Sequence, residues 1–498
     1  MTRRLIRKHL GVFMLACMIC VSAQAGPDSS VADAPSTAQP TSMPASGHQA
    51  PLSVKQMRDD LAFLRAKILS QHSNPYLYTN AKTFDQLYRE LDRGLDRPLD
   101  RLEFYRRAAR LAASLKDGHT LVDLQIDDFE AFAKIHGVFP LQVSFIGGKL
   151  YVSAHQSAEA KLKPGTEITA INGKSTAAIV EDCQALINDV HPIYDVYARL
   201  FRELYWLSYG ASPGFAIAYR NKDGSSGTTT VPAHLFPPGA FHSYEPEGLA
   251  YKFEILPSSQ VGLLTINSFS PSDQFDAFID ASFATLQRGK TDALIIDIRK
   301  NGGGSGRLAQ QVVSYLTEQP YQLIGAFYVK VTDDLKTLYR QATTHTDEDT
   351  RQIVMSHPSG ELVDGLKDSG PVVITPVHRE HVFHGKLYLL TANNTFSAAA
   401  MFAAYIKCNQ LGTVVGEAPG QATNFVADAV PFTMPNSKLS FEVSFSEIHM
   451  PCEQSYYQGI RPDYPVTPSP DQLAAGKDAA LDYTLKLIEQ WRHSNTAR

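Results

Sequence analysis

The stretch that decides the fold of this chain is Asn393-Asn394-Thr395-Phe396-Ser397-Ala398-Ala399-Ala400. Before it stands an apolar run rich in Leu and Tyr, 386–391, which predicts a buried strand. After it, good helix formers continue to Lys407. Ser397 is therefore predicted to lie where a strand turns into a helix, beside the free N–H groups of the first helical turn.

Two interpretations of this serine are open. A Ser or Thr before a helix is most often an N-cap, whose side-chain oxygen accepts a hydrogen bond from a helical N–H. Alternatively, a hydroxyl held rigidly at such a turn is a nucleophile, and the helix N–H groups stabilise a developing oxyanion. The decision between a cap and a nucleophile depends on the rest of the chain.

The chain around Ser397 alternates strand and helix patterns, which is typical of an α/β layer fold. The predicted strands are 261–266, 293–298 and 413–417, and the predicted helices are 274–287 and 308–316. The run 327–380 is polar and irregular, and we interpret it as a long excursion that could cover a site.

A glycine cluster follows the buried strand 293–298. Asn301-Gly302-Gly303-Gly304 does not match the spacing of a nucleotide-binding loop. Glycines also let backbone N–H groups approach a ligand oxygen closely. The N–H groups of Gly303 and Ala398 would together form an oxyanion hole.

A serine nucleophile needs a base, and the candidate is His119. It lies in the polar turn Lys116-Asp117-Gly118-His119-Thr120, directly after a predicted helix. An imidazole has a suitable intrinsic pKa for taking a proton from a hydroxyl near neutral pH. One histidine among 16 is by itself no evidence of catalysis.

Two further regions precede the α/β part. Apolar residues at helical spacing, such as Met57, Leu61, Leu64 and Ile68, predict an N-terminal helical domain at 53–135. In 136–250, Gly147-Gly148 predicts a hairpin turn. The run 162–174 resembles the strand–turn–strand of PDZ domains, which bind a peptide along a sheet edge; an ordinary hairpin is the alternative.

The first residues have the features of a targeting segment. Four basic residues, an apolar run and Ala23-Gln24-Ala25 predict a signal peptide at 1–25 and export to the periplasm or medium. Lipid attachment at Cys17 is the alternative that fits less well. Residues 26–52 are rich in Pro, Ser, Ala and Thr and are expected to be a disordered spacer. No later stretch is apolar enough to span a membrane.

Composition excludes several kinds of function. With 46 Lys plus Arg against 51 Asp plus Glu, the net charge of −5 gives no reason to expect nucleic-acid binding. The cysteine spacing predicts no zinc site, and no metal or cofactor is expected. For Cys408 and Cys452, a disulfide and free thiols are both open. The sequence leaves the oligomeric state open as well.

Taken together, the motifs resemble peptidase family S41, which contains C-terminal-processing proteases, the tricorn core protease and retinoid-binding repeats. The resemblance spans 76–485. The motifs, in the family's order, are Asp117–Thr120, the PDZ-like run, 296–304, 395–400, 415–417 and 459–463. It implies a ClpP/crotonase-like catalytic domain at 251–490 and hydrolysis of peptide bonds.

The chain departs from the C-terminal-processing proteases at one position. Those enzymes use a Ser–Lys dyad with the lysine 25 residues after the serine, where this chain has Ala422. The tricorn-like branch pairs Ser with His, which His119 fits. Glu453, with Glu447 as a second candidate, is the expected acidic partner of the imidazole.

The sequence thus predicts an exported serine peptidase that acts on a peptide or protein substrate. Ser397 is the expected nucleophile, His119 the base and Glu453 the acid, with Gly303 and Ala398 forming the oxyanion hole. The alternative is a catalytically silent ligand- or peptide-binding protein on the same fold, as in the retinoid-binding repeats.

Overall fold

The computed structural model describes residues 50–155, 162–235, 250–257, 259–272, 274–341 and 348–496. The predicted signal peptide and nearly all of the predicted spacer therefore lie outside the described residues. Within the described part, no helix is both long and apolar enough to cross a membrane.

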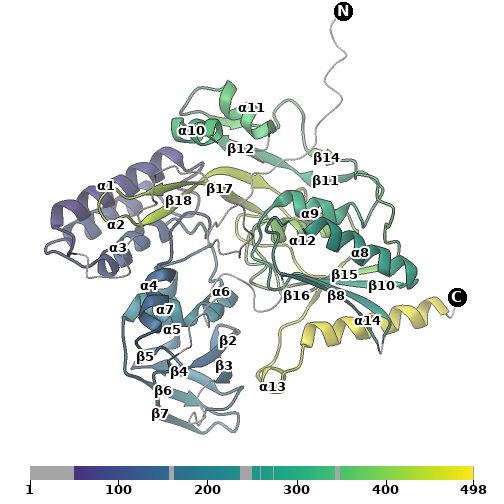
Figure 1. Cartoon of the computed structure of the whole chain (residues 1–498), viewed down its shortest axis with the longest axis horizontal. Helices are drawn as coiled ribbons and strands as arrows, with labels where there is room; N and C mark the ends of the chain where they lie inside the picture. Colours follow the sequence, from purple (N-terminus) through teal and green to yellow (C-terminus); the bar gives the residue numbers. More distant parts are fainter. Residues whose placement is uncertain are drawn as a thin grey trace, which may run out of the picture.

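A six-stranded sheet forms the centre of the α/β part (Figure 1). Its strands, in spatial order, are β19 (Tyr464–Pro465), β16 (Thr413–Gly416), β15 (Lys386–Thr391), β10 (Ala293–Asp297), β9 (Val261–Ile266) and β8 (Tyr251–Leu256). All pairs are parallel except β8 with β9. Ser397 follows β15 and the glycine cluster follows β10. Because these are parallel neighbours, both segments emerge at the same edge of the sheet.

Helices cover both faces of this sheet. The helices α8 (Phe275–Arg288), α9 (Gly306–Val313) and α12 (Ala398–Cys408) lie on one side, and α14 (Ala479–Thr496) lies on the other, after the short α13 (Pro470–Ala474) (Figure 1). Successive strand residues point to opposite faces of the sheet. Leu294 and Ile296 belong to the core under α8, α9 and α12, whereas Ile295 packs with Ile488 of α14. Burial on both faces explains why these strands read as continuous apolar runs.

A second sheet connects this region to the N-terminal part. Its strands are β1 (Leu121–Val122), β18 (Ser440–His449), β12 (Ala326–Lys330) and β13 (Leu362–Asp364), with β17 (Asn424–Thr433) also paired to β18. The run 327–380, interpreted above as irregular, contains β12, β13, α10 (Asp333–Gln341), α11 (Glu348–Ser356) and β14 (Val372–Ile374), the last paired with β11 (Tyr321–Ile324). The expectation of irregular structure was wrong because β12 pairs with residues 446–449 of β18, and local patterns do not reveal so distant a partner.

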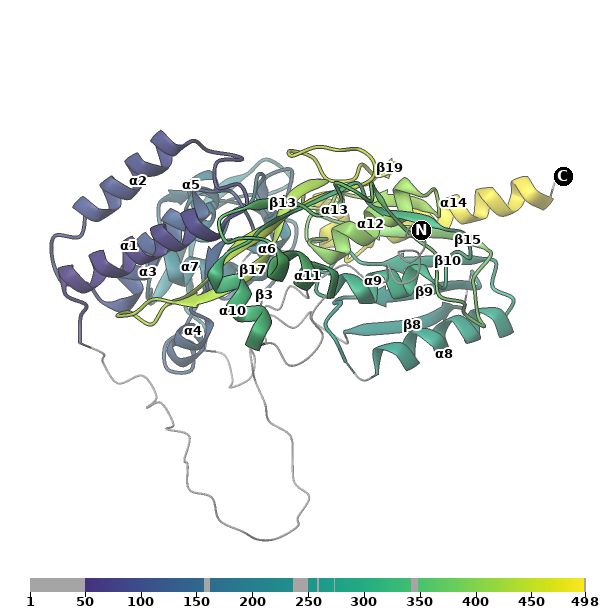
Figure 2. The ribbon, with the colours of Figure 1, turned by 90° about the horizontal axis from the view of Figure 1, so that it is seen from above.

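The N-terminal helices α1 (Val54–Gln71), α2 (Ala81–Arg93) and α3 (Arg101–Ala113) lie at the opposite end of the molecule from α14 in both views (Figures 1 and 2). The short α4 (Ile126–Ala133) follows β1. The predicted stripe Met57, Leu61, Leu64 and Ile68 is fully buried. These helices, the next module and the start of β18 share one apolar core.

Within the predicted 136–250 region, the described residues form a sheet with helices beside it. Its strands are β2 (Leu141–Ile146), β3 (Lys149–His155), β4 (Glu167–Ile171), β5 (Lys174–Ser175), β6 (Gly214–Arg220) and β7 (Ser226–Pro232), and its helices are α5 (Thr176–Gln184), α6 (Tyr194–Arg199) and α7 (Phe201–Tyr209). The hairpin predicted at Gly147-Gly148 is confirmed as β2–β3, and Asn172-Gly173 connects β4 to β5.

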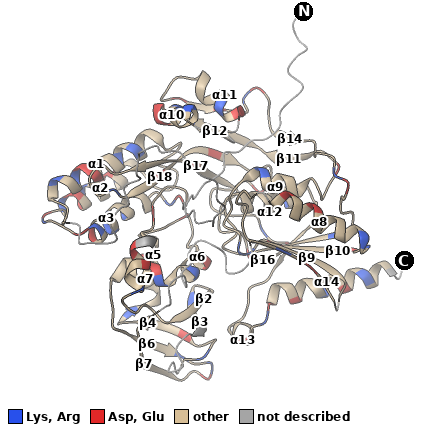
Figure 3. Ribbon diagram, in the orientation of Figure 1, with Lys and Arg blue, Asp and Glu red and all other residues tan. Residues whose placement is uncertain are grey.

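Lys and Arg positions alternate with Asp and Glu positions along the described helices, as the ribbon in Figure 3 shows.

Candidate active site

Ser397 lies at the junction of β15 and α12 in a conformation that L residues rarely adopt. Its φ is 51° and its ψ is −127°. Its side chain makes no capping hydrogen bond to the helix, so the N-cap interpretation does not hold. Strain of this kind persists only where the surroundings enforce it, and it concentrates at functional sites.

His119 approaches this hydroxyl from a segment far away in the sequence. Its Nε2 lies 3.2 Å from Ser397 Oγ, and the two side chains are 4% and 8% exposed. The imidazole stacks on the rings of Phe396 and Phe425, at centroid distances of 5.1 and 6.3 Å. The two residues that the sequence predicts as base and nucleophile are therefore within hydrogen-bonding reach.

The turn that carries His119 is packed too closely for any side chain at Gly118. A Cβ there would lie 2.6 Å from the Phe396 ring and 2.8 Å from Asp189 Oδ2. The Gly118 N–H instead donates to Asp189 Oδ2 at 3.1 Å. Burial raises the pKa of Asp189 to about 7, and the nearby charge of Asp117 adds to that rise.

Asp117 is the carboxylate beside the imidazole. Its Oδ1 accepts the His119 backbone N–H at 2.9 Å and lies 3.8 Å from His119 Nδ1. Its Oδ2 lies 3.2 Å from His72 Nε2 and accepts from Ser444 Oγ at 2.6 Å. Burial alone would raise the pKa of this carboxyl, but the hydrogen bonds and charges of His119 and His72 outweigh it and hold the pKa well below its usual range. Asp117 is thus ionised at neutral pH.

Gln421 contacts both members of the Ser397–His119 pair. Its Oε1 accepts the Ser397 backbone N–H at 2.6 Å, and its Nε2 lies 3.4 Å from His119 Nδ1. No sequence motif singles out Gln421. The available signal was its position directly before Ala422, where the Ser–Lys relatives carry their base.

The glycine loop lies directly against Ser397. Gly303 has a φ of 111°, and a Cβ on it would lie 2.6 Å from Ser397 Cβ and 3.1 Å from the Ala398 nitrogen. Ala398 is the first residue of α12, so its N–H has no acceptor within the helix. The Gly303 N–H, in contrast, donates to Asn301 Oδ1 at 2.8 Å. Of the two expected oxyanion donors, Gly303 therefore has an acceptor already.

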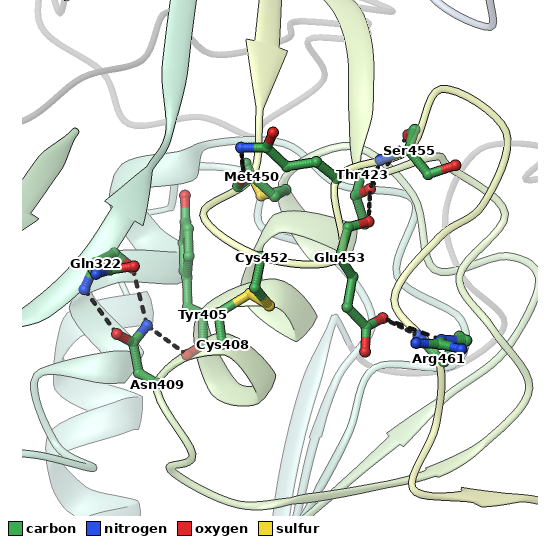
Figure 4. The surroundings of a disulfide bond; sticks show 11 residues. Gln322, Tyr405, Cys408, Asn409, Thr423, Met450, Cys452, Glu453, Ser455 and Arg461 are labelled. Atoms are coloured by element: carbon green, nitrogen blue, oxygen red, sulfur yellow. Dashed lines mark hydrogen bonds and ion pairs between the residues drawn. A yellow bond between two sulfur atoms is a disulfide. The ribbon is translucent and has the colours of Figure 1, made fainter. Parts of the chain in front are cut away.

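The expected acid, Glu453, is engaged elsewhere. Its carboxylate accepts the Arg461 N–H at 2.9 Å, next to the Cys408–Cys452 disulfide (Figure 4). The expectation was based on distance along the chain, whereas the backbone at Glu453, with φ 51°, turns beside Cys452. The second candidate, Glu447, accepts hydrogen bonds from Tyr456 Oη at 2.7 Å and pairs with His449 at 2.8 Å. Asp117, which precedes His119 by two residues, takes the place beside Nδ1.

The disulfide that the sequence left open is present in the structure. It joins the end of α12 to the loop after β18, across 44 residues of sequence. Cys183 is a buried free thiol, and burial raises its pKa to about 12. In the described part of the chain, no group of three or more His, Cys, Asp or Glu side chains could hold a metal ion.

Comparison with known proteins agrees with this architecture. Residues 260–466 match peptidase family S41. The chain is similar in structure to mature CPAF, with a TM-score of 0.62, 16% identity and coverage of 87% of this chain and 96% of that one. It is also similar to mature CPAF complexed with lactacystin, with a TM-score of 0.61, 16% identity and coverage of 88% and 98%. At this identity the likeness concerns the fold. No curated protein sequence matches the chain.

The family match contains the glycine cluster, the β15–α12 junction and Gln421, and the fold places them at one edge of a ClpP-like sheet with added modules. Residues 260–466 are therefore the part of the chain that matches peptidase family S41, and the protein is a serine peptidase.

Proposed function

We propose that this peptidase cleaves peptide bonds with Ser397 as nucleophile and His119 as general base, in place of the Ser–Lys dyad of many relatives. The observation that carries the proposal is the 3.2 Å separation of Ser397 Oγ and His119 Nε2 in a nearly buried site. Ala422 cannot supply the lysine. The strained backbone of Ser397 and its lack of a capping role support a nucleophile.

The mechanism follows from these positions. His119 Nε2 takes the Oγ proton as Ser397 attacks the scissile carbonyl, and it later donates that proton to the leaving amine. Asp117, ionised and 3.8 Å from Nδ1, stabilises the imidazolium that forms. The Ala398 N–H binds the oxyanion. Gly303 is the second donor when its N–H shares or releases Asn301 Oδ1.

We further propose that the chain acts outside the cytoplasm and that its 136–250 module binds an extended peptide at a sheet edge. A disulfide between Cys408 and Cys452 is typical of proteins from oxidising compartments. The five-strand path β2-β3-β4-β6-β7 offers edges for peptide addition.

Hydrolysis of unfolded casein tests the proposed nucleophile. We expect Ser397→Ala to lose activity by more than 10³-fold, because nothing else can form the acyl-enzyme. The matched control is Ser356→Ala, an exposed serine at the end of α11, which should keep wild-type activity. Full activity in a folded Ser397→Ala protein would refute the proposal.

A further inference from the structure

The amide of Gln421 is inserted between the backbone of the nucleophile and the ring of the base. It is 2% exposed, so water does not compete for its hydrogen bonds. One end contacts the Ser397 nitrogen at 2.6 Å and the other faces His119 Nδ1 at 3.4 Å. The orientation of this amide therefore bears directly on the protonation of His119.

The orientation follows from hydrogen-bond chemistry. A backbone N–H is only a donor, so the Gln421 atom 2.6 Å from the Ser397 nitrogen must be the oxygen. A flipped amide would bring two donors together at that distance. The group that faces His119 is then –NH₂, which can only donate. In this contact His119 Nδ1 is the acceptor, which in the neutral ring places the proton on Nε2.

This tautomer is the wrong one for a general base. With its proton on Nε2, the ring donates toward Ser397 Oγ and cannot accept the hydroxyl proton. The contact also disfavours the imidazolium, because both of its ring N–H groups need acceptors. In serine peptidases with an Asp–His–Ser set, fixing the wrong tautomer lowers turnover by about 10⁴-fold.

A competing acceptor is available for the other tautomer. Asp117 Oδ1 lies 3.8 Å from Nδ1, which is beyond hydrogen-bonding distance but within reach of a small ring movement. The carboxylate is fixed by Ser444 and His72, so it offers a stable charge to an Nδ1–H group.

We propose that Gln421 is a positioning residue that holds His119 in the Nε2-protonated tautomer. The imidazole then cannot accept the Ser397 proton until the Gln421 amide leaves Nδ1. This inference rests on the proposed function of the Ser397–His119 pair. On release, the Nε2 proton passes to water and a proton from water binds at Nδ1, facing Asp117. Nε2 then accepts the Ser397 hydroxyl proton, with no net gain or loss of protons before attack.

The backbone around Gln421 is tightly packed, so the change is one of its side chain. A Cβ on Gly420 would lie 2.2 Å from the Asn393 carbonyl oxygen, and one on Gly459 would lie 2.6 Å from the Gln421 carbonyl oxygen. Gly420 N–H also donates to the Thr395 carbonyl at 3.1 Å. The backbone of Gln421 is thereby fixed beside the nucleophile turn, so release from His119 Nδ1 is a movement of its side chain.

The rate of labelling by a fluorophosphonate tests this role in the full chain. In Gln421→Glu, one carboxylate oxygen accepts the Ser397 N–H and the other accepts Nδ1–H, so the active tautomer is favoured. We expect labelling at least about tenfold faster than wild type, with the ~10⁴-fold tautomer penalty as the upper bound. Gln421→Met, which removes the donor without adding charge, should also label faster than wild type.

Gln490→Glu, the same change at an exposed position on α14, is the matched control and should label at the wild-type rate. If Gln421 only supported the structure of the site, its replacement would make labelling slower than in the wild type. If the Glu and Met variants both fold and both label no faster than wild type, Gln421 does not hold the base in reserve.

A spectroscopic measurement separates this inference from the proposed function. With ¹⁵N-labelled histidine, the His119 signal is identified by its loss in His119→Gln. We expect a proton on Nε2 in the wild type and on Nδ1 in Gln421→Glu. A proton on Nδ1 in the wild type overturns the inference even if Ser397 is catalytic. If Ser397→Ala keeps both labelling and hydrolysis, the proposed function is wrong. The tautomer of His119 is still measured in that case, so the two outcomes are distinguishable.

Discussion

Ser397 and Gly303 are adjacent residues in space with backbone conformations that the fold enforces. The φ of Ser397 is 51° and that of Gly303 is 111°, and a Cβ on Gly303 would lie 2.6 Å from Ser397 Cβ. A glycine is required at 303 both by its backbone angle and by the space that the nucleophile occupies.

Gly303→Ala should therefore lower the fluorophosphonate labelling rate by ~10²-fold or more, because the added Cβ displaces the loop and its N–H from the nucleophile, and destabilise the fold by about 1–3 kcal/mol. Gly302→Ala is the matched control, since a Cβ there meets nothing within 4 Å. Equal labelling rates in the two variants would show that the loop does not approach the reacting carbonyl.

A second prediction concerns the stability that the carboxylate of Asp117 contributes. Its folded-state pKa is depressed, so its contribution to stability is present above the unfolded-state pKa and is lost as the pH falls below it. Asp117→Asn should lower the free energy of unfolding by about 1.5–3 kcal/mol at pH 7, the worth of a hydrogen bond to a charged group.

Denaturant titrations of the wild type and Asp117→Asn at pH 7 and below pH 4 check this. The stability difference should shrink at the lower pH, where the wild-type carboxylate loses its advantage. A difference that stays constant with pH would mean that Asp117 does not carry the charge assigned to it.

Among the secondary-structure elements, α12 starts directly after Ser397 and ends at Cys408, whose disulfide holds the loop after β18. That loop packs on the segment of Gln421: Thr423 Oγ1 donates to the Glu453 carbonyl at 2.6 Å (Figure 4). The disulfide thus connects the far end of the nucleophile helix to the segment that contacts the base.

Removing this crosslink in Cys408→Ala/Cys452→Ala should lower the free energy of unfolding by about 4 kcal/mol in the loop-entropy account, given the 44 residues enclosed. Thermal unfolding with and without reductant measures it: reductant should lower the Tm of the wild type and leave the double variant unchanged. In Cys183→Ala, which leaves the disulfide intact, reductant should still lower the Tm. If it does not, the effect of reductant in the wild type comes from Cys183 and not from the disulfide.

Sequence patterns predicted the elements whose partners are local or whose faces are fully buried. The strand before Ser397, the hairpin at Gly147-Gly148 and the helical stripe of Met57 are of this kind. The strands in 327–380 escaped prediction because β12 depends on a distant partner. In the site, the motifs around Ser397 and His119 predicted the pair that the structure places in contact. Glu453 was predicted from its distance along the chain and lies elsewhere. Gln421 belongs to no motif and was not predicted.

Across the whole molecule, the segment 189–195 contacts both catalytic turns. Asp189 accepts the Gly118 N–H beside the base, and Asp195 Oδ2 accepts the Asn394 N–H at 3.0 Å, three residues before the nucleophile. His191 lies between these two residues in the sequence, and its Nε2 is 2.6 Å from the Tyr457 carbonyl oxygen. The position of the module and the geometry of the Ser397–His119 pair are therefore coupled.

Asp195→Ala should slow fluorophosphonate labelling by about tenfold or more, because it releases the Asn394 turn and a small misplacement of a reacting group is costly. The global Tm should change little. Asp223→Ala, in the exposed turn between β6 and β7 of the same module, is the control. Unchanged labelling in Asp195→Ala would mean that the module is not coupled to the nucleophile through this contact.

The dependence of Ser397 reactivity on a histidine from another part of the molecule is tested most directly by fluorophosphonate labelling of wild type and His119→Ala. The account predicts a covalent adduct on Ser397 in the wild type, its loss in His119→Ala, and its retention in His493→Ala, an exposed histidine on α14. An adduct that forms at the wild-type rate in folded His119→Ala would contradict it.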